Sequence, residues 1–63
     1  MNVTENEIMQ NVLNIGRIMI HHSEKRRIKA AESMVNNFVL YEKHDSIAPD
    51  GVRVFVLNIS PSF

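Results

Sequence analysis

Cysteine and tryptophan are absent from this sequence of 63 residues, and glycine and proline occur only twice each. Without cysteine no disulfide can stabilise the fold, and a zinc site would depend on the three histidines, His21, His22 and His44. His21 and His22 are neighbours, so on a helix they project about 100° apart and do not share a metal easily. We therefore expect no bound metal.

A chain this short is expected to bury only about 60% of the surface that its unfolded form exposes. Conformational entropy, at roughly 1.5 kcal/mol per ordered residue, offsets most of what this burial contributes. Small domains compensate with disulfides, metals or association with a second chain. Because the first two are not expected here, the sequence predicts a homo-oligomer, most simply a homodimer, in which a second chain completes the core.

Long apolar runs are missing as well, since none approaches the roughly 20 residues that span a membrane. The N-terminus carries Asn2, Thr4 and Glu5 where a signal peptide would have basic residues and then an apolar segment. The composition, 44% hydrophobic and 22% charged, is that of a globular protein. Together with the absence of cysteine, these features predict one small domain over residues 1–63, located in the cytoplasm and not bound to a membrane.

Sequence signatures of enzymes are missing too. There is no glycine-rich phosphate loop, no His-Glu-x-x-His and no cysteine nucleophile. None of the five serines lies in a recognisable catalytic motif. We therefore expect a protein without catalytic activity and without a cofactor.

The N-terminal segment has the pattern of a helix that begins at Glu5. Thr4 and Glu7 have the spacing of a capping box, in which the side chain of each residue bonds the backbone of the other. Val3 and Ile8 stand where a hydrophobic staple would pack. The acidic side chains of Glu5 and Glu7 also suit the positive end of the helix dipole.

Apolar residues then recur at helical spacing over residues 8–20. They form two adjacent stripes, one with Ile8, Val12, Ile15 and Met19, the other with Met9, Leu13 and Ile20. A helix that is apolar over so broad a sector packs against two neighbours, and one of these could be another molecule. Gly16 lies inside the pattern, either as a tolerated residue or as a point where another backbone comes close.

A second helix is expected after His21–Ser23, which interrupts the apolar pattern. Ser23 can cap this helix, and Glu24 suits its first turn. Its apolar residues again recur at helical spacing: Ile28, Ala31, Met34, Val35 and Phe38. On one unbroken helix this stripe would point nearly opposite to the stripe that starts at Ile8. We therefore expect two helices, with one long helix in a dimer as the alternative.

The C-terminal third favours β-structure. Residues 52–59 are rich in β-branched and aromatic side chains and predict a strand buried on both faces, which Ser60 and Pro61 end. Residues 48–51 predict a turn before it. Residues 38–43 either form the first strand of a hairpin, which we favour, or end the second helix, in which case the last strand pairs with another chain.

The expected fold class is therefore α+β, with two N-terminal helices followed by a β-hairpin or a single strand, completed by dimerisation.

The net charge is zero, but the charges are unevenly distributed along the chain. Between residues 17 and 29, five basic residues stand against one acid, Glu24: Arg17, Lys25, Arg26, Arg27 and Lys29. Lys25 and Lys29 are four residues apart on the expected helix, where like charges repel. An anionic partner would relieve this repulsion, so the five basic residues are our candidate partner-binding residues. The alternative is a solvated helix face.

Two classes of partner fit such a cluster, an acidic protein surface and the phosphates of a nucleic acid. The pI of about 6.8 and the lack of aromatic residues among the basic ones are atypical of a dedicated nucleic-acid binder. We therefore expect a small regulatory protein, of the kind that phages and mobile elements encode, that acts as a homodimeric protein-binding modulator. A nucleic-acid-binding regulator is the alternative.

Overall fold

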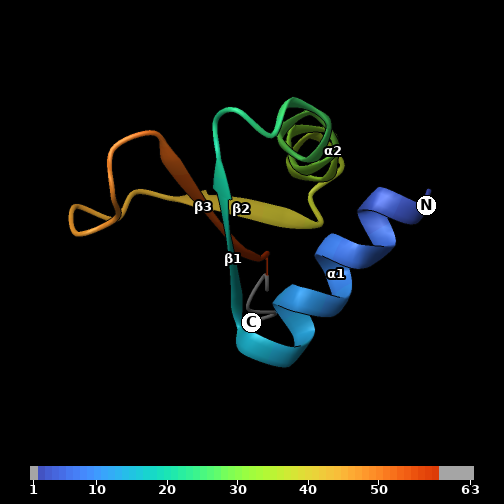
Figure 1. Ribbon diagram of the computed structural model, residues 1–63. Helices are drawn as coiled ribbons and strands as arrows, with labels where there is room; N and C mark the ends of the chain where they lie inside the picture. The colour runs from blue at the N-terminus through green and yellow to red at the C-terminus, as the bar shows by residue number, and fades with distance from the viewer. Residues whose placement is uncertain (1, 59–63) are drawn as a thin grey trace, which may run out of the picture.

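The computed structural model describes residues 2–58, which form two helices and one three-stranded antiparallel sheet (Figure 1). In chain order the elements are α1 (Val3–Ile15), β1 (Arg17–His21), α2 (Lys25–Asn36), β2 (Leu40–Lys43) and β3 (Val52–Leu57). Both helices lie on the same side of the sheet, α1 mainly against β1 and α2 mainly against β2. The expected α+β class is confirmed.

The strand arrangement differs from the expected hairpin or single strand. The sheet order is β1-β3-β2, so the last strand lies in the centre and has an antiparallel partner on each side. In the register with β1, Arg17 stands opposite Val56, and in the register with β2, Lys43 stands opposite Val54. The backbone of β3 therefore finds its hydrogen-bond partners within the chain, and a second chain is not needed to supply them.

Helix α1 begins two residues earlier than expected, and a different capping box begins it. The Glu5 amide donates to Asn2 Oδ1 at 2.8 Å, and the Asn2 amide donates to Glu5 Oε1 at 3.1 Å. Asparagine is a better N-cap than threonine, and the earlier start adds helical hydrogen bonds, so the box expected at Thr4 and Glu7 is wrong. The staple is not formed either, because Val3 is inside the helix and 74% exposed.

The first helix also ends earlier than expected, at Ile15, and a strand replaces its last turn. Gly16 has a left-handed backbone (φ 96°), and its amide donates to the Val12 carbonyl at 2.8 Å, which ends the helix. Gly16 is therefore not a residue tolerated inside a helix, because it ends the helix, and it does not mark a close approach, because no atom lies within 4 Å of an added Cβ. After it, Ile18 and Ile20 are buried and their neighbours exposed, which is strand alternation.

Helix α2 occupies the expected segment, but its ends differ in detail. The N-cap is Glu24, whose side chain makes no capping bond, and Ser23 instead pairs with His21 in the preceding turn. At the other end Phe38 lies beyond the helix, has a left-handed backbone (φ 63°) and is 80% exposed. The single long helix is wrong, because β1 and a turn separate α1 from α2.

Residues 40–43 form a strand that pairs with residues 52–57 across the loop 44–51. Gly51 ends this loop with a left-handed backbone (φ 81°), as the turn prediction requires. An added Cβ on Gly51 would lie only 2.5 Å from His22 Cδ2, so the position also lacks room for a side chain. The expected strand end at Ser60 and Pro61 lies outside the described residues.

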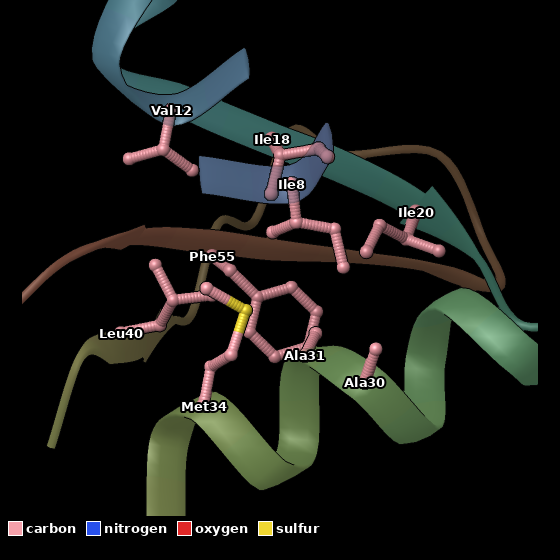
Figure 2. Close-up of a cluster of buried hydrophobic side chains, with 9 residues drawn as sticks. All are labelled: Ile8, Val12, Ile18, Ile20, Ala30, Ala31, Met34, Leu40 and Phe55. Carbon is pink, nitrogen blue, oxygen red and sulfur yellow. The ribbon is translucent and has the colours of Figure 1, made fainter. Parts of the chain in front are cut away.

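One hydrophobic core joins all five elements. Figure 2 shows its side chains pointing toward one another from both helices and all three strands: Ile8, Val12, Ile18, Ile20, Ala30, Ala31, Met34, Leu40 and Phe55. Phe55, from the central strand, is fully buried, and burial of such a side chain contributes about 1.5–3 kcal/mol. The two helices therefore cover one face of the sheet, and among residues 2–58 no helix covers the other.

Neither helix among residues 2–58 has the length and apolarity required to cross a membrane.

Candidate interaction surface

The side of the sheet that faces away from the helices carries a coherent set of side chains. Because side chains alternate along a strand, the strand residues that alternate with the core residues Ile18, Ile20, Leu40 and Phe55 point to this side. We call it the open face, and it consists of Arg17, Met19, His21, Tyr41, Lys43, Val52, Val54 and Val56. None of these eight residues is acidic.

The middle of the open face is apolar. Three valines follow one another along the central strand, with Met19 and Tyr41 on the two outer strands. Met19 is 43% exposed and Tyr41 is 58% exposed, whereas Val54, which stands between Met19 and Lys43, is only 2% exposed. The side chains of Met19 and Tyr41 therefore flank the row of valines and present the accessible apolar surface.

The rim of the open face is basic. Arg17, His21 and Lys43 occupy its margins, and Arg17 Nη1 lies 4.0 Å from Asp45 Oδ2. Since Arg17 belongs to β1 and Asp45 follows β2, this ion pair reaches across the central strand, which helps to explain why Val54 is covered. At that distance, with the Arg17 side chain 54% exposed, the pair is weak and can give way to another anion.

The five predicted partner-binding residues are not brought together on one surface. Arg17 and Arg27 line a groove beside β1, together with Asn11, Ile15, Ile18 and Met19. Arg26 and Lys29 line a second groove, between α2 and the N-terminal end of α1. Consecutive helical residues project in different directions, and this separates Arg26 from Arg27.

The basic residues of α2 also differ in their pairing. Arg27 Nη1 lies 3.0 Å from Glu24 Oε1, and this hydrogen bond, with one from the His21 backbone, lowers the pKa of Glu24. In the described part of the chain Lys25, Arg26 and Lys29 form no ion pair. These three charges are therefore the ones on α2 that a phosphate or a carboxylate could engage.

A three-residue ionic network on the helix side of the sheet was missed by the sequence analysis. Arg53 donates to both carboxylate oxygens of Glu42, at 2.8 and 2.7 Å, and to Glu32 Oε2 at 3.0 Å. The hydrogen bonds from Arg53 hold the pKa of Glu42 below its ordinary value, although partial burial opposes this. The network joins β3, β2 and α2, and the single positive charge of Arg53 partly offsets two carboxylates that stay exposed to solvent.

The turn from β1 to α2 carries the adjacent histidines. His21 Nδ1 lies 2.7 Å from Ser23 Oγ, the His22 amide donates to the Gly51 carbonyl at 2.7 Å, and the two imidazole rings are 4.4 Å apart. These contacts fix the turn against the loop that precedes β3. No group of three or more potential metal ligands occurs within residues 2–58.

Sequence analysis did not identify Met19, Tyr41 or Lys43 as surface residues of interest. The available signal was the alternation of buried and exposed types from Arg17 to His21 directly after Gly16, which is typical of a strand. These residues were expected in a helix because the apolar residues from Ile8 to Met19 also recur at helical spacing. A segment of only five residues fits the period of a helix as well as that of a strand.

Comparison of the chain with protein-family models, with curated proteins and with solved structures found no match.

Proposed function

We propose that this protein is a small non-enzymatic binding module that docks on another protein through its open face. The observation that supports the proposal is the sheet side without a helical layer, where an apolar centre stands inside a basic rim. Protein interfaces have this organisation, with apolar and aromatic side chains in the middle and polar ones around them. Tyr41 and Met19 would form the centre of the contact.

The charge of the open face favours an acidic partner. None of the eight open-face residues is acidic and Arg17 pairs only weakly with Asp45, so carboxylates of a partner would find complementary positions at Arg17 and Lys43. Two copies placed face to face would instead bring Arg17 and Lys43 of one copy close to the same cations of the other. We therefore propose a different protein as the partner at this face; homodimerisation through another surface stays a prediction.

The experiment that tests this proposal compares two substitutions at equal exposure. Tyr41 on the open face and Leu13 on α1 are both 58% exposed, so Tyr41→Asp and Leu13→Asp introduce the same charge at matched sites. The wild-type chain is first used to capture binding proteins from the native host, and the captured partner is then identified and purified. Binding of the purified partner, measured by calorimetry, should fall at least about tenfold for Tyr41→Asp and stay within about twofold for Leu13→Asp.

Equal affinities for these two variants would contradict the proposal. A loss confined to the double variant Arg26→Ala with Lys29→Ala would move the binding site to α2. Sedimentation of the wild-type chain alone, in the same buffers, reports whether a homodimer forms.

A nucleic-acid-binding regulator is the second candidate function, supported by the three cations of α2 that form no ion pair in the described residues. Nuclease treatment of the captured material separates the two candidates. Retention of a partner protein after this treatment supports protein binding. Loss of all bound material, together with a steep dependence of affinity on salt, would support phosphate binding by Lys25, Arg26 and Lys29.

A further inference from the structure

We infer that the outer edge of β1 accepts an extended acidic segment of the partner as a fourth strand of the sheet. This inference rests on the proposed function, because it specifies how part of the partner binds beside the open face. We call the side of β1 that is turned away from β3 the β1 edge. Its backbone groups, its groove and its charges each support this inference.

The direction of the backbone groups in β1 follows from one hydrogen bond at its end. The His22 amide donates to the Gly51 carbonyl at 2.7 Å, and these two residues continue the register of β1 with β3. In an antiparallel ladder hydrogen-bonded and non-hydrogen-bonded pairs alternate. Ile20 and Ile18 therefore bond β3, whereas the amides and carbonyls of His21, Met19 and Arg17 point to the β1 edge.

Glu24 occupies the far end of this edge. Its amide donates to the His21 carbonyl at 2.9 Å, and its carboxylate accepts from the His21 amide at 3.3 Å. No such contact with another loop or helix is made by the Arg17 or Met19 backbone among residues 2–58. These two residues therefore present two donors and two acceptors in the spacing that an added strand requires.

The groove beside the β1 edge suits alternate side chains of an added strand. On the helix side it is lined by Asn11, Ile15, Ile18 and Arg27, and Ile15 is 71% exposed there. On the opposite side stand the open-face residues Arg17, Met19 and His21. Since side chains of a strand alternate between the two sides, apolar residues would contact Ile15 and Ile18, and acidic residues would approach Arg17 and His21.

The second free edge of the sheet fits such a segment less well. The Asn58 amide donates to the Val39 carbonyl at 3.0 Å, and these two residues continue the register of β2 with β3. By the same alternation, the backbone amides and carbonyls of Leu40 and Glu42 point away from β3, to the outer edge of β2. The strand is one residue shorter than β1, and Glu42 would repel an acidic segment. The charge of the chain therefore selects the β1 edge.

The test uses a capped octapeptide in which glutamate and valine alternate, titrated into the isotope-labelled chain. We expect the amide resonances of Arg17 and Met19 to shift and the hydrogen exchange of the Met19 amide to slow. Replacing the glutamates of the peptide by lysines should abolish both effects. N-methylation of alternate peptide amides on the pairing side should weaken binding about tenfold, since it removes ladder hydrogen bonds.

A matched pair of variants tests the same contact from the protein side. Met19→Pro removes the outward amide, which an edge strand tolerates, and Met19→Val keeps it. Because both variants lose the methionine side chain and differ in the backbone amide, we expect peptide affinity to be about tenfold lower for Met19→Pro than for Met19→Val. The N-methylated peptide keeps the test decisive if Met19→Pro does not fold.

The outcomes distinguish this inference from the proposed function. Shifts confined to Tyr41 and Val56 would overturn edge addition and leave docking on the open face standing. Shifts confined to Arg26 and Lys29, or binding that is insensitive to N-methylation of the peptide, would also overturn it. Absence of any shift at saturating peptide would overturn the acidic-strand inference, whatever the result with the Tyr41→Asp variant.

Discussion

Arg53 makes three side-chain hydrogen bonds that link three elements of the fold. It lies on the helix side of β3, bonds Glu42 through two nitrogens and Glu32 through a third, and its guanidinium carbon is 5.3 Å from the centre of the Phe55 ring. A planar guanidinium can satisfy these directions at once, whereas an ammonium group cannot. The side chain is about one-third exposed, so solvent screens the ion pairs.

Substitution Arg53→Lys should lower the free energy of unfolding by about 0.5–1 kcal/mol at neutral pH, because the charge remains but the paired hydrogen bonds are lost. The pKa of Glu42 is lowered in the folded state, so its contribution is present above its unfolded pKa and is lost as the pH falls through its folded pKa. The difference between the two proteins should therefore shrink between about pH 5 and pH 3. Urea unfolding at several pH values measures it.

The Glu42→Gln variant is the control for this pH dependence. It lacks the titrating carboxylate and should lose less stability on acidification than the wild type over the same pH range. Parallel pH profiles for the two proteins would show that the contact between Arg53 and Glu42 does not contribute to stability in solution.

At the scale of the elements, each helix is followed by a residue with a left-handed backbone, and only one of these two residue types suits that conformation. Gly16 follows α1 and adopts φ 96° without strain, while Phe38 follows α2 and adopts φ 63° with a bulky side chain. The Val39 amide donates to the Met34 carbonyl at 2.8 Å and the Phe38 amide to the Val35 carbonyl at 3.0 Å, which is a helix ending that normally has glycine. The 80% exposure of Phe38 shows that core packing does not hold it there.

We therefore predict that Phe38→Gly raises the free energy of unfolding by about 1 kcal/mol, because it removes the strain of a left-handed phenylalanine. Gly16→Ala should lower it by about the same amount, since the position has space for a Cβ and only the backbone conformation opposes it. Chemical denaturation of both variants measures whether the free energy of unfolding rises or falls as expected. A stability loss in Phe38→Gly would indicate that the aromatic ring makes a stabilising contact.

At the scale of the whole molecule, the core among residues 2–58 draws on both helices and all three strands but is small. No polar or charged residue among residues 2–58 is buried, and the largest buried side chain is Phe55. A single core in a domain of this size rarely supplies more than about 3–5 kcal/mol. Truncation of one large core side chain is therefore sufficient to unfold the protein.

Phe55→Ala should lower the free energy of unfolding by about 3–5 kcal/mol and leave the chain largely unfolded at room temperature. Phe55→Leu should cost less than about 1.5 kcal/mol and keep the fold, because most of the volume is retained. Circular dichroism and thermal unfolding distinguish the two. Cooperative unfolding of Phe55→Ala with near-native stability would mean that the core has other support, such as a second chain.

The sequence by itself determined α2 and β3, as well as the presence of a helix near the N-terminus. Each of these depends on a local pattern: a repeat of apolar residues from Ile28 to Val35, a run of β-branched residues from Val52, and a capping pattern at Thr4 close to the true start of the helix. Sequence also identified the turn at Gly51, because proline, aspartate and glycine there favour it whatever the rest of the chain does.

Only the tertiary structure decided that residues 17–21 form a strand, and everything that depends on it. Five residues with Ile18 and Ile20 fit either period, and pairing with β3, far along the chain, selects the strand because its backbone and side chains are then both satisfied. This pairing places β3 in the centre, creates the open face and the β1 edge, and separates Arg17 from Arg26. The same pairing gives β3 a partner on each side within its own chain, so its backbone hydrogen bonds do not require a second chain.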